Sequence, residues 1–240
     1  MAHLHRFFHT TPPSPEGDAV LSRDESHHAM RVIRARAGDA VVLFDGAGTE
    51  WSGTISVLAR NEVVVAIESE RHEARLVPEV TLAQAWLHRD KILDEIVRQS
   101  TVLGAAEIVF FRGEHSEKAP RLSDKWERIA VEACKQCGRF WLPRFSVVDD
   151  LAAVLDGAVE QDILIAQMEG PHVPLSQVDA KKALTFLVGP EGDFSPSEYA
   201  QTAAAGAVPI SLGACTYRAE MAALVGLTLI QHQLGHMGPR

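Results

Sequence analysis

The sequence predicts an α/β protein in which a small β domain precedes a larger domain built on a mainly parallel sheet. Three observations lead to this fold. Short apolar runs of the strand type fill the first 70 positions, strands and helices alternate after about residue 78, and two glycine-centred loops follow apolar runs near the C-terminus. The 240 residues, 46% of them hydrophobic, are enough for two modest cores.

The first 70 residues are expected to be mostly short strands. Residues 41–44 lead into a hairpin-type turn at 45–48, and residues 51–58 and 62–67 then alternate in the half-buried manner. These strands predict a small β barrel. The pattern becomes polar at 71–78 before it changes character, so we place the domain boundary between residues 72 and 73.

Strands and helices alternate beyond the boundary, which predicts a mainly parallel sheet. Gly104 stands where the C-cap of a helix belongs. Ser195, Pro196 and Glu198 mark a helix start, as N-cap, first-turn proline and capping-box glutamate. The expected strands are 81–86, 107–111, 163–166, 184–188 and 208–212, and the other expected helices are 91–103, 123–137 and 221–230.

Two loops, LVGPEGDFS at 187–195 and LGACTYRAE at 212–220, each follow a buried strand. Pro190 removes a backbone donor, and the glycines beside it let the main chain approach a ligand closely. Strand ends of a parallel sheet meet at one edge, so these loops and a third exit at Gln167-Met168-Glu169-Gly170 predict a shared pocket. The alternatives are ordinary turns, with Arg218 and Glu220 as a solvated pair at a helix start.

Composition limits the class of protein. No apolar run reaches the roughly 18 residues that span a bilayer, and the start lacks the core of a signal peptide, so we expect a soluble cytoplasmic protein without membrane contact. Three cysteines suit a reducing compartment. Cys134 and Cys137 have C-x-x-C spacing, but zinc would need two more ligands, and a redox motif would follow a strand, whereas this pair lies in a helical pattern. We therefore expect no metal and interpret the two cysteines as small helix residues, with metal or redox use as the alternative.

Two basic clusters are candidates for phosphate contact although the net charge is −9. Phosphate groups interact with the local charge of a surface patch rather than with the net charge of the whole protein. Interleaved acidic residues leave open a solvated face of mixed charge. One cluster consists of Arg121, Lys125 and Arg128, which are expected to share a helix face, with Arg139 further along; the other consists of Arg31, Arg34 and Arg36 beside His27 and His28.

The two loops resemble those of the SPOUT methyltransferases, most closely the family that methylates N3 of a uridine in 16S ribosomal RNA. GPEGDFS is similar to that family's GPEGGFS, with Asp193 in place of a glycine. The second loop is similar to the pattern LGxRILRxETA at Leu212, Gly213, Arg218, Glu220 and Ala222, and departs from it at Cys215, Thr216, Tyr217 and Met221.

The resemblance covers nearly the whole chain. The segment HHAMRVIR at 27–34, with Gly38-Asp39 and LFDG at 43–46, looks like the family's amino-terminal domain. EACKQCGR at 132–139 is similar to the family's EAxxQSxR segment. Gln99 and Val102 differ from the family, which has a lysine and a glutamate at these two positions.

The resemblance implies a PUA-like RNA-binding β barrel over residues 1–72 and a SPOUT domain with a C-terminal trefoil knot over residues 73–240. It further implies a homodimer, S-adenosyl-L-methionine as methyl donor, and small-subunit ribosomal RNA or the assembled small subunit as partner. The expected donor-binding residues are Met168, Leu187, Gly189, Glu191, Gly192, Leu212, Gly213, Cys215 and Tyr217, and the expected catalytic residues are Arg218 and Glu220.

The expected reaction needs orientation of donor and acceptor and removal of the N3 proton of uracil. Arg218 would stabilise charge on the carbonyl oxygens, and Glu220 would accept the proton or, as we favour, hold Arg218. Alternatives are a methyltransferase for another RNA nucleotide, a non-catalytic SPOUT-fold RNA-binding protein, and a structural assembly protein. A ribose 2′-oxygen enzyme would need an asparagine motif near the first helix of this domain, whereas Asn61 is the sole asparagine.

Overall fold

The computed structural model describes residues 4–60, 62–168, 170–178, 180 and 183–238, so Asn61 lies outside the described residues. The chain divides into two compact units. One unit combines Met1–Arg75 with Val131–Leu142, and the other combines Leu76–Ala130 with Pro143–Arg240. Within the described ranges, no helix is long and apolar enough to cross a membrane.

The N-terminal unit is built on a five-stranded sheet with the order β1-β3-β4-β5-β2. Phe7, Leu43 and Trp51 are among the residues of its core. The predicted hairpin turn at 45–48 is confirmed: an Asp45 carboxylate oxygen accepts the N–H groups of Ala47 and Thr49 at 2.7 and 2.9 Å. The strands are β1 (His5–Phe8), β2 (Asp18–Val20), β3 (Ala40–Phe44), β4 (Thr49–Ala59) and β5 (Glu62–His72).

A helical segment that the sequence reading did not anticipate interrupts these strands. It consists of α1 (Arg23–His27) and the π-helix η1 (His28–Ile33). Ser22 caps α1 by accepting the Glu25 N–H, and Arg34, at φ 57°, ends η1 in the left-handed conformation. The five strands agree with the expectation of mostly short strands, and this helical segment adds to it: Ala29 of η1 is completely buried against the sheet core.

The start of helix α3 (Lys125–Cys137) contradicts the expected arrangement of the first basic cluster. The Ser123 carbonyl accepts the Trp126 N–H at 3.1 Å, and the helix begins only after it. Arg121 therefore precedes the helix and cannot share a helical face with Lys125. Trp126 points inward as predicted, and its ring centroid lies 4.6 Å from that of Phe110.

The larger unit has the predicted parallel sheet, with the order β11-β9-β10-β6-β7-β8 and every neighbouring pair parallel. Strand β8 and helix α4 were not predicted. The strands are β6 (Val80–Ala85), β7 (Glu107–Phe111), β8 (Arg144–Val147), β9 (Asp162–Ala166), β10 (Leu184–Val188) and β11 (Val208–Ile210). The remaining helices are α2 (Asp90–Leu103), α4 (Leu151–Gly157), α5 (Pro196–Ala204), α6 (Ala219–Gln233) and the 3-10 turn η2 (Leu175–Gln177).

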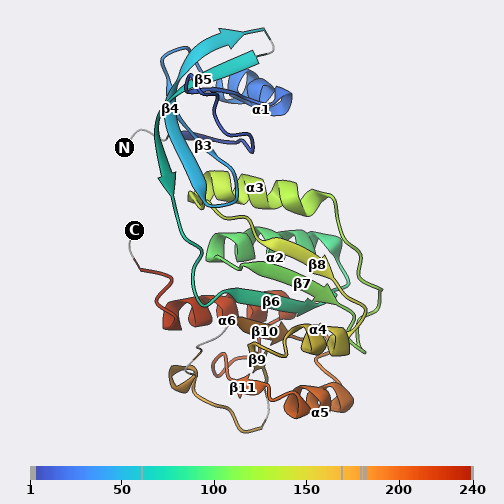
Figure 1. Ribbon diagram of the computed structural model, residues 1–240. Coiled ribbons are helices and arrows are strands. Elements are labelled where there is room, and N and C mark those ends of the chain that lie inside the picture. Colours follow the sequence, from blue (N-terminus) through green and yellow to red (C-terminus); the bar gives the residue numbers. More distant parts are fainter. Residues whose placement is uncertain (1–3, 61, 169, 179, 181–182, 239–240) are drawn as a thin grey trace. The chain divides into compact units, whose positions relative to one another are not determined.

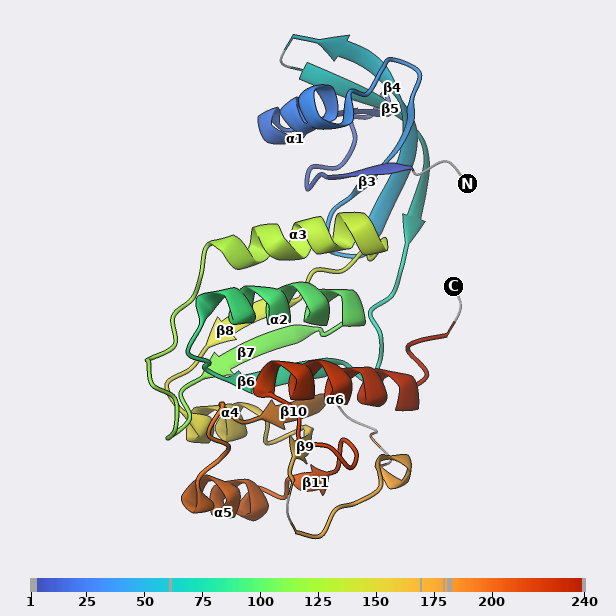
Figure 2. The same cartoon turned by 180° about the vertical axis from the view of Figure 1, so that it is seen from behind.

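Helices cover both faces of this sheet (Figure 1). Figure 2 shows α2 and α6 side by side on one face, where they bury Leu93 and Leu227 with Phe186 of β10. On the other face, α4 contributes Leu151 and Val154 to a second cluster. Gly104, at φ 84°, caps α2 as predicted. Because the strands are parallel, their carboxyl ends share one edge of the sheet.

Candidate functional site

A cavity of about 810 Å³ lies at the carboxyl edge of this sheet. Segments that follow five strands contribute to its wall, including both glycine loops and the third exit after β9. The predicted meeting of these segments is confirmed. Its lining consists of His88, Arg89, Ile92, His115, Glu117, residues 166–168, residues 188–193, residues 211–220 and Ala222.

The first loop turns sharply after β10, and close contacts leave little room for a side chain at its glycines. A β-carbon at Gly189 would lie 3.2 Å from the Phe194 ring, and one at Gly192 would lie 3.1 Å from His115. Asp193 adopts φ 61°, a conformation that aspartate tolerates better than most residues. Its carboxylate accepts the Phe194 N–H at 2.8 Å and the Tyr199 hydroxyl at 2.9 Å. An aspartate can therefore stand at a left-handed position of this loop.

Glu198 anchors the far end of the same loop from inside the protein. Glu198 is only 2% exposed. One carboxylate oxygen accepts the Ser195 N–H at 2.8 Å, which completes the predicted capping box with Ser195 as N-cap. The other oxygen accepts the Glu114 N–H at 3.0 Å. Glu198 thus ties the loop after β10 to the segment after β7.

His115 makes a second tie between these segments. Its Nδ1 lies 3.0 Å from the Gly192 carbonyl oxygen and 2.8 Å from the Asp193 carbonyl oxygen. Carbonyl oxygens only accept, so Nδ1 carries a proton and donates it. The bond to Asp193 is the main cause that raises the pKa of His115. The protonated imidazole therefore favours the observed loop conformation.

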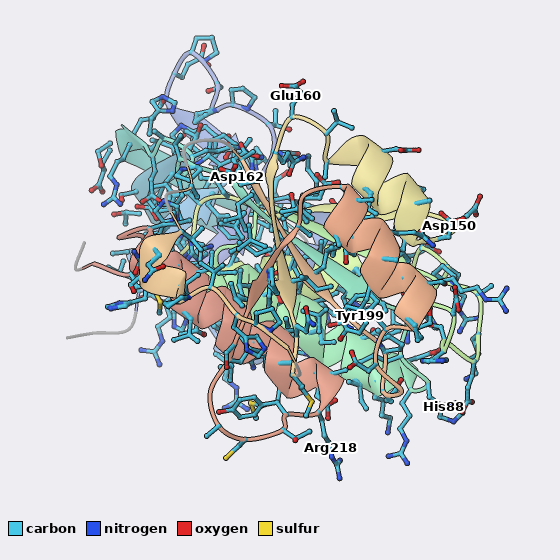
Figure 3. All side chains as sticks on the ribbon, turned by 90° about the horizontal axis from the view of Figure 1, so that it is seen from below. His88, Asp150, Glu160, Asp162, Tyr199 and Arg218 are labelled. Atoms are coloured by element: carbon cyan, nitrogen blue, oxygen red, sulfur yellow. The ribbon has the colours of Figure 1, made fainter. Side chains whose placement is uncertain are left out.

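The second loop leads from β11 into α6. Gly213 adopts φ 127°, which favours glycine, and its N–H donates to the Ser211 hydroxyl at 3.2 Å. Arg218 is the N-cap of α6 and extends outward at the rim of the domain (Figure 3), while Glu220 lies in the first turn of α6. Among the described residues, no ion pair joins Arg218 to Glu220, so the favoured holding contact is not formed here.

Most of the predicted donor-binding and catalytic residues line the cavity together. Leu187 does not, because it belongs to the buried strand β10 and packs in the core on the α4 side, whereas its neighbour Val188 faces the cavity. Met168 is 58% exposed and contributes an apolar wall. The predicted residues found in the lining are Met168, Gly189, Glu191, Gly192, Leu212, Gly213, Cys215, Tyr217, Arg218 and Glu220.

Two family models match the chain. One, described as an RNA methyltransferase domain, matches residues 74–231. This chain belongs to the RNA methyltransferase family. It is therefore an enzyme, as the two loops indicated. The second model, described as an RNA methyltransferase PUA domain, matches residues 21–68, which supports a PUA-like N-terminal domain in this RNA methyltransferase.

Relatives of known structure or curated name agree with this family. Ribosomal RNA small subunit methyltransferase E of Synechocystis is 28% identical over 223 residues, which span 90% of this chain and 73% of the relative. A probable rRNA-methyltransferase from Porphyromonas gingivalis is 29% identical with a TM-score of 0.86, and covers 98% of this chain and 100% of its own. A putative methyltransferase from Legionella pneumophila, solved with bound SAM, is 26% identical with a TM-score of 0.82, and covers 95% and 97% respectively.

Sequence reasoning missed the part of the wall that follows β6 and β7. His88 and Arg89 come after β6, and His115 and Glu117 come after β7. A usable signal was present, because both strands were predicted to belong to the same parallel sheet. Their carboxyl ends must then reach the same edge as the glycine loops.

The predicted RNA-contact residues differ in exposure and in ion pairing. Arg31, Arg34, Lys125 and Arg128 are exposed, and Arg139 is half-buried. Arg121 pairs with Asp90 at 2.7 Å, and Lys125 lies 3.9 Å from Asp94. The C-x-x-C pair lies in α3, with Cys134 buried, and the described residues contain no group of three or more possible metal ligands.

Proposed function

We propose that this RNA methyltransferase transfers the methyl group of S-adenosylmethionine to N3 of a uridine in 16S ribosomal RNA. The observation that carries the proposal is the single cavity that both glycine loops share, with Arg218 at its rim. The small-subunit target is supported by the name of the Synechocystis relative, and the donor by the SAM-bound Legionella structure. N3 of uridine as the acceptor rests on the resemblance of the two loops.

The cavity fits the donor in size and chemistry. Small-molecule sites are roughly 300–1,000 Å³ and mostly apolar with a few polar groups. Here Met168, Val188 and Leu212 supply apolar surface, and the glycine loops supply main-chain groups that no side chain obstructs. When bound, S-adenosylmethionine supplies an activated methyl group, so the protein needs no covalent intermediate.

Arg218 and Glu220 are the proposed catalytic residues. An outward guanidinium at the rim can reach the carbonyl oxygens of a uracil and stabilise the negative charge that follows loss of the N3 proton. No ion pair within the described part of the chain occupies Arg218, which leaves its donors available for such a contact. Glu220 is half-buried in the first turn of α6, close in sequence to that guanidinium.

RNA contact is proposed for the exposed Arg31, Arg34, Lys125 and Arg128, together with Arg121 and Arg139. Residues 1–72 would form the RNA-binding domain and residues 73–240 the methyltransferase domain, in a cytoplasmic enzyme. A closed PUA-like barrel is supported by two register shifts between β4 and β5, since bulges bend and twist a sheet.

A trefoil knot and a homodimer also belong to the proposal. The knot is supported by the sheet order, in which the chain passes from β10 to the edge strand β11 and then returns as α6 against β10 and β6. The dimer is supported by exposed apolar side chains on α6, where Met221 is 48% and Leu229 37% exposed. Sedimentation of the purified protein tests the dimer.

Calorimetry with S-adenosylmethionine and a methylation assay test the function. We expect donor binding, and we expect small subunits from cells that lack this gene to acquire one N3-methyluridine in 16S ribosomal RNA, identified by mass spectrometry of nucleosides. A different methylated nucleoside would establish a retargeted enzyme. Absence of donor binding would instead favour a non-catalytic RNA-binding protein.

A further inference from the structure

The segments after β6 and β7 form a part of the cavity wall to which the proposed function assigns no role. They bring His88, Arg89, His115 and Glu117 to the cavity that the glycine loops also line. Methylation at N3 requires a group that removes the N3 proton. Of the side chains on this wall, His88 has the surroundings that such a group needs.

His88 is fixed at three points although its side chain is 52% exposed. Its main-chain N–H donates to a Glu191 carboxylate oxygen at 3.0 Å, and its carbonyl oxygen accepts from the Lys118 ammonium at 3.0 Å. Its ring Nδ1 lies 2.5 Å from a Glu117 carboxylate oxygen. Within the described ranges, ring atom Nε2 has no hydrogen-bond or ion-pair partner.

A carboxylate on one ring nitrogen decides which tautomer a neutral histidine adopts. Because Glu117 can only accept at Nδ1, the ring proton stays on Nδ1 and the lone pair lies on Nε2. The same carboxylate stabilises the imidazolium that forms when Nε2 takes up a proton. This arrangement is that of a general base with a positioning residue behind it.

We propose that His88 is the catalytic base that removes the N3 proton of the target uridine, with Glu117 as its positioning residue. This inference rests on the proposed function. In the reaction, the N3 proton moves to Nε2 of His88. The N3 electron pair forms the bond to the methyl carbon as the carbon–sulfur bond breaks, and the pair of that bond returns to sulfur. The products are N3-methyluridine, the neutral thioether and an imidazolium that later releases its proton to water.

The other titratable side chains of the cavity are less suited to this step. Asp193 is engaged by the Phe194 N–H and Tyr199, and Glu191 accepts the His88 N–H. His115 donates from Nδ1 to two carbonyl groups and has a raised pKa, so it tends to keep its second proton. Carboxylates such as Glu220 are in general weaker bases than imidazole.

Charged groups of both signs surround His88. Glu117 and Lys118 face it from the segment after β7, Glu191 faces it from the loop after β10, and Arg89 follows it in the chain. Two carboxylates and two cations leave no large net charge at this point of the wall.

The first test is His88→Gln in the full-length protein. Single-turnover methylation of small subunits at saturating donor should slow by at least about 100-fold, the usual contribution of a general base. The donor affinity measured by calorimetry should stay unchanged, which also shows that the variant is folded. The matched control is Arg98→Gln: Arg98 forms an exposed pair with Glu95 at 3.3 Å and does not line the cavity. It should react at the wild-type rate.

A chemical rescue separates a base from a structural residue. RNA made with 5-fluorouridine has a more acidic N3–H and needs less help to ionise. The defect of His88→Gln should shrink on this RNA, and its rate should keep rising with pH where the wild-type rate levels off. A residue that only shapes the wall would slow both RNAs equally.

Glu117→Gln should slow the reaction less than His88→Gln does, and the double variant should be no slower than His88→Gln alone, because Glu117 acts through His88. A wild-type rate and pH profile in His88→Gln would overturn the inference while the proposed function stands. If the wild-type protein neither binds the donor nor methylates small subunits, the proposed function fails and this inference fails with it.

Discussion

Gly226 lies in the middle of α6, where the helix backbone meets the ring of Phe186 on β10. A β-carbon at this position would lie 2.1 Å from Cζ and 2.4 Å from Cε1 of that ring. Carbon atoms in contact normally stay about 3.5–4.0 Å apart, so the ring or the helix would have to move by more than about 1 Å. The ring is fully buried in the core, where side chains pack closely.

Two effects therefore oppose each other in Gly226→Ala. Alanine is favoured over glycine in a helix by about 0.8–1.0 kcal/mol. Overpacking a core costs about 1–3 kcal/mol, and an overlap of this size belongs at the upper end. We expect a net loss of about 1–2 kcal/mol in the unfolding free energy of the larger unit. Donor affinity should fall as well, since Ala219 and Ala222 of α6 line the cavity.

Urea unfolding followed by tryptophan fluorescence measures this loss, because Trp86 and Trp126 both lie in the core of the larger unit. The matched control is Gly157→Ala at the end of α4, where a β-carbon would meet no atom within 4 Å. It should be neutral or gain up to about 1 kcal/mol. Adding Phe186→Leu to Gly226→Ala should recover part of the loss. A Gly226→Ala protein as stable as Gly157→Ala would refute the steric argument.

Three further predictions concern other residues. Arg218→Ala should lower turnover by about 100–1,000-fold and leave donor affinity nearly unchanged in calorimetry; near-normal turnover would remove Arg218 from the mechanism. The pKa of His115 is raised in the folded protein, so its stabilisation of the first glycine loop is complete below pH 6.5 and is lost as the pH rises through the raised value. Donor affinity of the wild type relative to His115→Gln should thus decline above pH 6.5, and a constant ratio would contradict this. Lys135→Met leaves the Glu25 carboxylate, 2.6 Å from the Lys135 ammonium and only 12% exposed, without this partner. It should cost about 3 kcal/mol in urea unfolding, whereas loss of the exposed pair in Arg98→Ala should cost less than about 0.5 kcal/mol.

Local signals predicted the elements that depend on neighbouring residues. The capping box at Ser195 and Glu198 and the C-cap at Gly104 are present as expected, because each is decided by hydrogen bonds and backbone conformation within a few residues. The helix at 23–33 was missed although Ser22 is an N-cap of the same kind. Ala29, Met30 and Ile33 of this segment face a sheet core that only the folded unit provides.

The amino-acid sequence determined the strand–helix alternation, the two glycine loops and their meeting at one edge, since a parallel sheet leaves its strand ends no other place. Tertiary structure decided which side chains reach the cavity. Leu187 turned to the core while its neighbour Val188 faced the cavity, and His88 and His115 entered the wall from strands with no recognisable loop motif. Contacts such as Glu117 with His88 join residues whose proximity depends on the strand order, which the local sequence pattern does not encode.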